Sequence, residues 1–164
     1  MAIVIDLLRH GDAAPASEGG DAARRLTERG RSNVAWIANQ VAAGPRPTRL
    51  FSSPLARARE TAELVAQRLN GALAIEGLPE LGPECEPEDV LQALSDRGIA
   101  SGHVLMVGHQ PLIGRLASHL TGTELPVPPA TLIRISCESI PIARSGRLER
   151  TWSPAVIGGN QAAG

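Results

Sequence analysis

Short apolar runs alternate with amphipathic stretches along most of this chain, a pattern typical of an α/β protein. Short apolar runs predict buried strands at residues 3–8, 49–52, 72–75 and 103–107, and the first of them is rich in β-branched residues. Each run is only a few residues long, which favours a strand over a helix.

Four helices are predicted from apolar residues at helical spacing and from capping residues. The first has Thr27 as its N-cap and ends at Gly44. Its buried face is expected to be formed by Val34, Ile37, Ala38 and Val41. The second has Ser53 as its N-cap and Pro54 as its first residue, and it ends near residues 70–71.

The other two predicted helices both begin at a proline and end at a glycine. Pro87 opens the third helix, with acidic residues in its first turn, and Gly98 ends it. Pro111 opens the fourth helix, and Gly122 lies just past its end.

Toward the end of the chain the pattern changes to an alternation of apolar and polar residues. Residues 131–136 and 147–153 alternate in this way, so we expect an antiparallel strand pair added to a parallel sheet. We therefore predict an α/β fold, a three-layer sandwich in which a mixed, mostly parallel sheet carries helices on both faces and ends in this antiparallel pair. Residues 1–157 form the expected single domain, followed by a flexible tail at residues 158–164.

Polar residues that could carry chemistry stand where the predicted strands end. Arg9, His10 and Gly11 follow the first apolar run, and His109 follows the fourth. Open α/β sheets place their ligands at the carboxyl ends of their strands. A histidine there can be a nucleophile, a base or a metal ligand, an arginine offers a planar fork of donors, and a glycine allows close approach to a ligand. The alternative is that Arg9 to Gly11 only form the structural end of a strand.

Further charged residues are candidates for an anion site at this edge. Arg57 lies about one turn inside the second predicted helix, where the helix dipole disfavours a cation, so its presence there fits a bound anion. Glu80 lies in a loop rich in proline and glycine, from which an acid could reach the same edge. Arg57 and Glu80 could instead be solvated surface charges. His103 and His119 are interpreted as ordinary surface or hydrogen-bonded residues.

Composition narrows the classes of function. The 164 residues suffice for one domain with a real core, and 43% of them are hydrophobic. Aromatic residues make up only 2% and the net charge is −1, which argues against binding of nucleic acid. Spacing that would suit a metal site is absent from the histidines and cysteines.

Cysteine spacing and hydropathy indicate the cellular setting. Cys85 and Cys137 form no CxxC pair, and we expect free thiols in a reducing compartment. No apolar run is long enough to span a bilayer, and no cationic leader precedes an apolar segment, so we expect a cytoplasmic protein.

Three motifs, in this order, resemble the histidine phosphatase (phosphoglycerate mutase-like) superfamily. They are LRHG at residues 8–11, SSPLARARETA at residues 52–62 and VGH at residues 107–109. Two further short motifs, RRLT at residues 24–27 and LPEL at residues 78–81, resemble those of the small SixA-type phosphohistidine phosphatases. The chain leaves little room for the cap insertions of larger relatives. Its Ala/Gly-rich segment after the first motif departs from the mutases, which argues against mutase activity.

The resemblance implies a two-step phosphatase mechanism that needs no metal or cofactor. Neutral His10 attacks phosphorus and becomes a phosphohistidine, which water then hydrolyses. Arg9, Arg57 and His109 bind the equatorial phosphoryl oxygens. By the same resemblance, Glu80 acts as general acid toward the leaving group. The RRLT and RHG motifs likewise assign substrate contacts to Arg24 and Gly11.

Three functions remain open at this point. The first is a phosphatase for phosphohistidine of a signalling or carrier protein, such as a phosphotransfer domain, which an open site without a cap would suit. The second is a small-molecule phosphomonoesterase for a sugar or nucleotide phosphate. The third is a non-catalytic phosphoprotein-binding module, against which the full set of Arg9, His10, Arg57 and His109 argues. We expect a monomer that binds neither nucleic acid nor a membrane.

Overall fold

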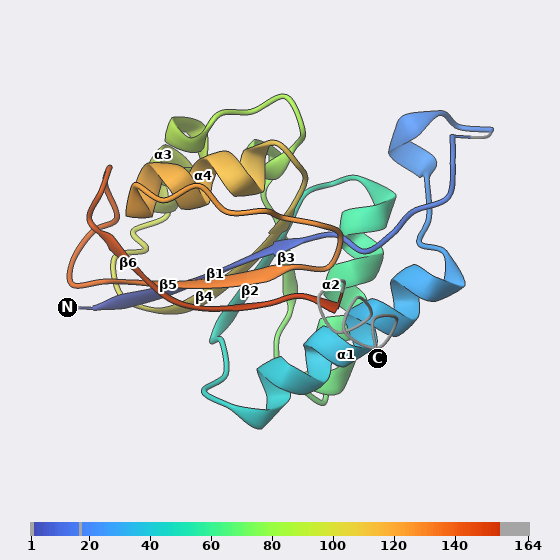
Figure 1. Cartoon of the computed structure of the whole chain (residues 1–164), viewed down its shortest axis with the longest axis horizontal. Helices are drawn as coiled ribbons and strands as arrows, with labels where there is room; N and C mark the ends of the chain where they lie inside the picture. Colours follow the sequence, from blue (N-terminus) through green and yellow to red (C-terminus); the bar gives the residue numbers. More distant parts are fainter. Residues whose placement is uncertain (1, 17, 155–164) are drawn as a thin grey trace.

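The computed structural model describes residues 2–16 and 18–154, which fold around one six-stranded mixed sheet (Figure 1). The strands are β1 (Ile3–Arg9), β2 (Arg49–Ser52), β3 (Ile75–Gly77), β4 (Gly102–Gly108), β5 (Leu132–Cys137) and β6 (Gly146–Trp152). They are ordered β3-β2-β4-β1-β5-β6. Parallel pairing joins β3, β2, β4 and β1, whereas β5 and β6 pair antiparallel, as the alternating pattern predicts.

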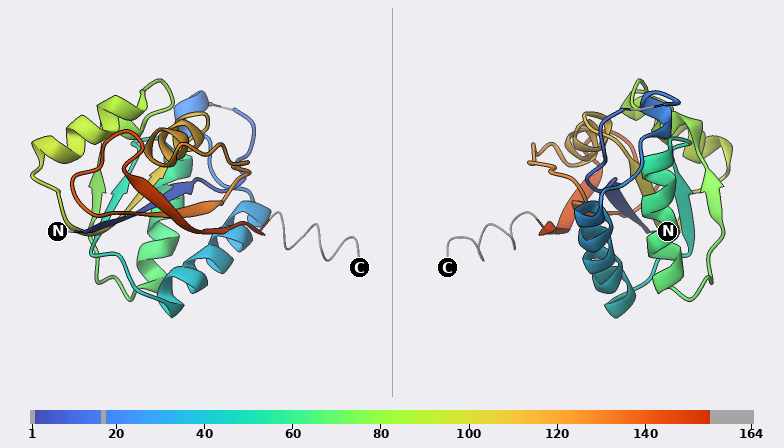
Figure 2. Two further views of the ribbon diagram at one scale, coloured as in Figure 1. Left: turned by 60° about the vertical axis from the view of Figure 1, so that its left-hand side comes forward. Right: turned by 90° about the vertical axis from the view of Figure 1, so that its right-hand side faces the viewer.

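Helices cover both faces of this sheet, so the predicted three-layer α/β fold is confirmed (Figures 1 and 2). The helices are α1 (Glu28–Ala43), α2 (Ala56–Arg68), α3 (Pro87–Asp96) and α4 (Leu112–Thr121), with short 3₁₀ turns η1 (Asp21–Ala23) and η2 (Pro79–Leu81). One buried apolar cluster joins α1 and α2 to the sheet and includes Ile37 and Val65. The other joins α3 and α4 to the opposite face and includes Met106 and Leu116.

Several helix ends lie where the sequence predicts them. Thr27 caps α1, because its Oγ1 accepts a hydrogen bond of 2.9 Å from the backbone N–H of Gly30. Gly44 is the C-cap of that helix. At the end of α4, Gly122 takes a φ of 75°, a left-handed conformation that glycine adopts without steric cost.

The predicted start of the second helix is wrong by two residues. α2 begins at Ala56 with Leu55 as its N-cap, whereas the sequence favours Ser53 as the cap. The Ser53 hydroxyl instead lies 2.7 Å from Nε2 of His109, so a partner from a distant strand takes the group that would have capped the helix. Arg57 is consequently the second residue of α2 rather than a residue one turn inside it.

The third strand also lies later in the chain than its apolar run predicts. Strand β3 covers residues 75–77 instead of 72–75. Asn70 and Gly71 have φ angles of 60° and 66°, and Ala72 N donates to Leu69 O, so these residues form the turn that leaves α2. Pairing with β2 begins only at Ile75.

The register of the central strands brings two predicted site residues to one level of the sheet. Arg9, the last residue of β1, pairs with Gly108, the last residue of β4. The backbone N–H of His10 then donates to Gly108 O at 3.0 Å. His10 and His109 therefore leave the sheet side by side at its carboxyl edge.

Cys85 and Cys137 are free thiols, as expected. None of the helices in the described part of the chain combines the length and the apolar character needed to cross a bilayer. The tail predicted at residues 158–164 lies outside the described residues.

Candidate active site

The structure brings four residues that the sequence singled out to one place at the carboxyl edge of the sheet. His10 follows β1, His109 follows β4, and their ring centroids lie 5.0 Å apart. Arg57 reaches them from the first turn of α2, with its Nε 3.3 Å from His10 Nε2. Arg9 ends β1 directly before His10. Segments that are distant in sequence therefore form one cluster with two arginines and two histidines.

The hydrogen bonds of His10 fix its tautomer. Its Nδ1 lies 2.7 Å from Gly11 O, and because a carbonyl only accepts, Nδ1 carries the proton. Its Nε2 accepts from the Arg57 Nε–H, so that nitrogen carries the lone pair. His10 is thus a neutral imidazole whose lone-pair nitrogen faces a guanidinium group.

Burial keeps both imidazoles neutral. Desolvation is the main cause that lowers the pKa of His10 to about 4, and the charges of Arg57, Arg9 and Arg24 lower it further, against a raising contribution from the bond to Gly11. The pKa of His109 is lowered to about 3, again by burial first and then by His10 and the arginines. Both rings can therefore act as neutral groups well below pH 7.

His109 is held from one side only. Its Nε2 lies 2.7 Å from the Ser53 hydroxyl, which also accepts from the backbone N–H of Leu55 at 3.3 Å. Its Nδ1 is buried and has no hydrogen-bond partner among the described residues. A second ring nitrogen is thereby free to meet a ligand.

Arg9 and Glu80 show the same incomplete pairing. Arg9 donates from Nη1 to Val127 O at 2.9 Å, but its buried Nε has no partner in the described part of the chain, and burial lowers the pKa of its guanidinium. Oε2 of Glu80, in η2, is likewise buried and unpartnered. The buried side-chain atoms that lack partners within residues 2–16 and 18–154 are Arg9 Nε, Glu80 Oε2 and His109 Nδ1. Such atoms are rare in folded proteins, and all three belong to residues that the sequence had selected.

Arg24 and Gly11 have contacts that the sequence did not indicate. Arg24 donates from Nε to Ala14 O at 2.7 Å and from Nη1 to Asp21 Oδ1 at 3.1 Å. A Cβ at Gly11 would lie 2.9 Å from Gly30 O, so the glycine is required here by the close approach of α1. Substrate contacts of Arg24 and Gly11 stay predictions.

Asp21 and Thr61 are functional candidates that the sequence reasoning missed. Arg57 donates from Nη1 to Asp21 O at 3.0 Å and from Nη2 to Asp21 Oδ2 at 3.3 Å. Thr61 Oγ1 accepts from the Gly11 N–H at 3.2 Å and donates to Arg57 O at 2.8 Å. Asp21 is an exposed acid in a loop and Thr61 is one of many residues on a helix face, so neither stands out by pattern.

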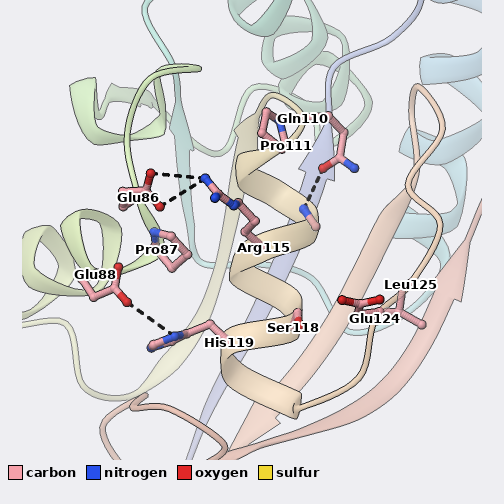
Figure 3. A pocket seen from close by; sticks show the side chains of 11 residues that line it. Glu86, Pro87, Glu88, Gln110, Pro111, Arg115, Ser118, His119, Glu124 and Leu125 are labelled. Carbon is pink, nitrogen blue, oxygen red and sulfur yellow. Dashed lines mark hydrogen bonds and ion pairs between the residues drawn. The ribbon is translucent and has the colours of Figure 1, made fainter.

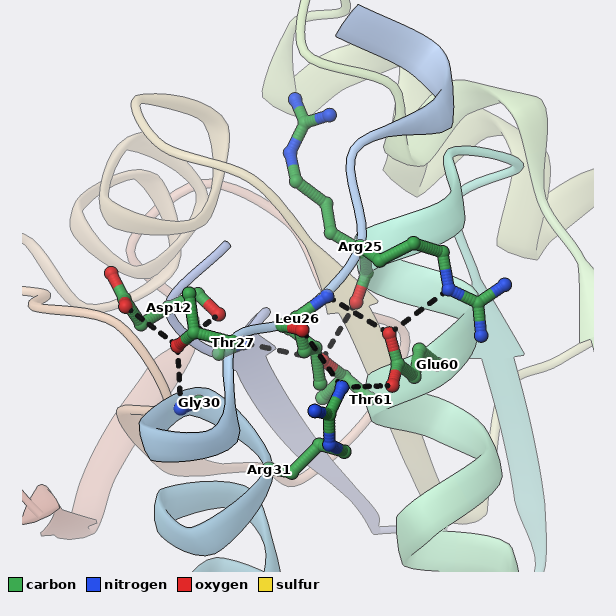
Figure 4. A network of polar contacts seen from close by, with 10 residues as sticks. Asp12, Arg25, Leu26, Thr27, Gly30, Arg31, Glu60 and Thr61 are labelled. Atoms are coloured by element: carbon green, nitrogen blue, oxygen red, sulfur yellow. Dashed lines mark hydrogen bonds and ion pairs between the residues drawn. The ribbon is translucent and has the colours of Figure 1, made fainter. Parts of the chain in front are cut away.

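A polar network beside the site ties the loop after β1 to α2 (Figure 4). Glu60, which is 8% exposed, accepts at Oε1 from the Leu26 N–H at 2.9 Å and at Oε2 from Arg31 Nη1 at 3.2 Å. Arg25 Nε also lies 3.3 Å from Glu60 Oε1. Its neighbour in the chain is Thr61, which contacts Gly11. The network therefore fixes the chain segment around Arg25 and Leu26 relative to the helix that carries Arg57.

A hollow of about 500 Å³ lies along α3 and α4, where Gln110 and Pro111 line its end (Figure 3). Its charged side chains pair across the two helices, Arg115 with Glu86 at 3.2 Å and His119 with Glu88 at 3.7 Å. The described clusters of His, Cys, Asp and Glu include no group of three arranged to hold a metal ion.

Known proteins are similar to this chain in fold and in sequence. The model of the histidine phosphatase superfamily (branch 1) matches residues 5–82. Phosphohistidine phosphatase SixA of Escherichia coli (strain K12) is 35% identical over 158 residues, which cover 92% of this chain and 94% of that protein. A SixA homolog of Haemophilus influenzae is 33% identical over 145 residues, which cover 80% of this chain and 86% of that protein. The structure of the protein histidine phosphatase SixA complexed with tungstate superposes with a TM-score of 0.75 at 29% identity, covering 96% of this chain and 99% of that one.

Proposed function

Since the chain belongs to the histidine phosphatase superfamily, in its SixA-type group, we propose that it hydrolyses phosphohistidine in a phosphorylated protein. The observation that carries the proposal is the tautomer of His10. Its Nδ1 proton is held by Gly11 O, so that the Nε2 lone pair faces Arg57, and the ring lies 5.0 Å from that of His109. A neutral imidazole beside two arginines suits attack on the electrophilic phosphorus of an anionic phosphoryl group.

In the proposed first step, His10 Nε2 forms a bond to phosphorus while the bond from phosphorus to the substrate imidazole nitrogen breaks. The leaving imidazole takes one proton, for which Glu80 is the proposed donor. The low pKa of His10, about 4, keeps the attacking nitrogen unprotonated at neutral pH.

In the second step, water attacks the phosphohistidine, and the bond between phosphorus and His10 Nε2 breaks. The products are inorganic phosphate and free His10, and Glu80 regains its proton from the water. Dividing the transfer into two displacements is the usual benefit of covalent catalysis.

The phosphoryl oxygens are the proposed ligands of Arg9, Arg57 and His109. Charge on these oxygens is stabilised by positioned donors, each contributing roughly 2–3 kcal/mol as a charge-assisted hydrogen bond. Arg9 Nε and His109 Nδ1 are buried without partners in the described chain, which fits donors whose acceptor is a ligand. The SixA relative was solved with tungstate, a tetrahedral oxyanion like phosphate.

The proposed nucleophile can be tested by substitution and trapping. We expect His10→Ala to abolish turnover and the wild type to retain labelled phosphate on His10 after a rapid quench that avoids acid. His119→Ala, a histidine of α4 with its own partner in Glu88, is the matched control and should stay active. Label recovered on Ser52 or Ser53 would contradict the assignment.

A panel of substrates tests the proposed specificity. A phosphohistidine protein is compared with a phosphoserine peptide, a sugar phosphate and an aryl phosphate, and we expect the highest kcat/KM for the phosphohistidine protein. A higher kcat/KM for the sugar phosphate would identify a small-molecule phosphomonoesterase instead.

Metal independence is a separate prediction, because the proposed chemistry uses only protein side chains. Activity on the phosphohistidine protein should be unchanged after treatment with EDTA. Loss of activity that zinc or magnesium restores would place a metal in the mechanism.

We also propose that the protein acts as a cytoplasmic monomer on a protein partner and does not bind nucleic acid. Free thiols at Cys85 and Cys137 and a net charge of −1 support this setting. Light scattering should give the mass of one chain, 17.2 kDa.

A further inference from the structure

One residue, Asp21, accepts hydrogen bonds both from Arg57 of the cluster and from Arg24 of the neighbouring loop. Arg57 donates from Nη1 to the backbone O of Asp21 at 3.0 Å and from Nη2 to its Oδ2 at 3.3 Å. Arg24 donates from Nη1 to Asp21 Oδ1 at 3.1 Å. Asp21 therefore takes donors of Arg57, which the proposed function assigns to the phosphoryl group, and of Arg24, for which the family resemblance implies a substrate contact.

The remaining described bond of Arg57 lies on the nucleophile. Its Nε–H donates to His10 Nε2 at 3.3 Å, so the lone pair that has to attack phosphorus is occupied. Arg57 must leave Nε2 before the bond to phosphorus can form. Asp21 holds the other end of the same guanidinium, and the two contacts together describe a resting arrangement of the site.

The turn that carries Asp21 is lightly anchored. None of the residues of η1 is buried, and the Asp21 side chain is 60% exposed. Gly19 and Gly20 precede it with φ angles of 92° and 73°, conformations that favour glycine. A segment with few buried contacts opens at small cost, so η1 can release Arg57 without disturbing the sheet.

We propose that Asp21 is a latch that holds Arg57 on the His10 lone pair until a phosphoryl group replaces the Asp21 carboxylate on Arg57 and Arg24. This inference rests on the proposed function and adds a specificity-determining residue to it. A ligand has to bind the two arginines better than a carboxylate does, which favours the doubly charged phosphoryl group over singly charged anions. Replacement also frees Nε2, so binding of the correct group prepares the nucleophile.

Affinity for inorganic phosphate tests the latch directly. We expect Asp21→Asn to bind phosphate about two- to fivefold more tightly than the wild type, the range of one exposed ion pair, and to show a similar fall in KM for an aryl phosphate. Glu18→Gln removes the same charge nearby, but Glu18 makes none of the described contacts with Arg57 or Arg24, and its affinity should match the wild type.

The side-chain ¹⁵N signal of His10 Nε2 provides a second readout. In the wild type, phosphate should shift this signal because the hydrogen bond from Arg57 Nε to His10 Nε2 is lost. The Asp21→Asn variant should already show part of that shift without phosphate. Both measurements are made on the full chain.

The outcomes separate the latch from the proposed function. Phosphate affinity of Asp21→Asn that is equal to or weaker than that of the wild type overturns the latch, and with wild-type turnover intact the proposed function stands. A wild type that neither binds phosphate nor hydrolyses any phosphorylated substrate overturns both.

Discussion

At the scale of single residues, the surroundings of His10 determine what its imidazole can do. The bond to Gly11 O leaves the lone pair on Nε2, and burial holds the pKa at about 4, so the ring is neutral where a free histidine would begin to protonate. Arg57 is 5% exposed and faces this nitrogen through its planar guanidinium. Position and geometry of the donor group therefore matter beyond its charge.

Replacement of Arg57 by lysine tests this geometry. Lysine keeps the positive charge but loses the fork of donors. We therefore expect a loss of about 2 kcal/mol in transition-state stabilisation, which lowers kcat/KM on the phosphohistidine protein roughly 30-fold. Arg59→Lys is the control, since Arg59 is partly exposed and makes no described contact with His10. Equal losses in the two variants would show that Arg57 has no special role.

The sequence predicted the four central residues of the site but not their immediate partners. Arg9, His10 and His109 could be placed because strands of a parallel sheet end at one edge. Asp21 could not, since an exposed acid in a Gly-rich loop has no periodicity or cap that signals a contact with Arg57. The link from Ser53 to His109 was hidden because serine before proline is also a good helix cap.

At the scale of elements, α2 connects the parts of the site. Arg57 lies in its first turn, and Thr61 follows one turn later on the same side. The Thr61 hydroxyl accepts from the Gly11 N–H and donates to Arg57 O, and Glu60 binds the segment before α1 (Figure 4). One helix thereby positions the end of β1 and the guanidinium group against each other.

Thr61 is accordingly a positioning residue whose hydroxyl can be removed with little change in shape. In Thr61→Val the buried Gly11 N–H loses its acceptor, and we expect the free energy of unfolding to fall by about 1–3 kcal/mol. We also expect kcat to fall while KM for an aryl phosphate changes less, because His10 shifts relative to the bound phosphoryl group. Thr61→Ser keeps the hydroxyl and should restore kcat. If serine and valine reduce kcat alike, the hydroxyl does not position the nucleophile.

Element boundaries differ from the predictions where another contact, near or distant in sequence, competes with the predicted element. Residues 72–75 are apolar enough for a strand, but the turn at Asn70 and Gly71 uses the first of them to leave α2. Helix α1 has no such competitor, and Thr27 and Gly44 bound it as predicted. Local patterns therefore located the elements well. They misplaced the start of α2, where the distant His109 contacts Ser53, and the start of β3, where the adjoining turn uses Ala72.

At the scale of the whole molecule, a buried charge cluster joins the central strands beneath the site. Asp6 of β1 is fully buried, accepts from Arg134 of β5 at 2.7 and 2.9 Å, and lies 2.6 Å from Nε2 of His103 in β4. His103 is thus a hydrogen-bonded residue, as expected, and its role is to join strands. The same strands carry His10 and His109 at the carboxyl edge, so these contacts link the strands that position the two site histidines.

The two buried histidines also make the stability of the whole molecule depend on pH. In the unfolded chain their pKa is near 6.5, whereas in the folded protein it is about 4 for His10 and about 3 for His109. Between these values the unfolded state binds more protons, so the free energy of unfolding decreases as the pH falls from about 6.5 toward about 4. For each histidine the loss between pH 7.5 and pH 5 is about 2 kcal/mol.

Urea unfolding in phosphate-free buffer at pH 7.5 and pH 5 measures this loss. Because one sheet joins both apolar cores, we expect a single cooperative transition at each pH, with a midpoint that is clearly lower at pH 5. Glutamine cannot bind the proton in either state, so His10→Gln and His109→Gln should each remove about half of the difference between the two pH values. His119→Gln should leave that difference unchanged, since His119 lies outside the buried cluster. A pH dependence that persists in full in the double variant His10→Gln/His109→Gln would mean that other groups cause it and that the two site histidines are not held neutral by the fold.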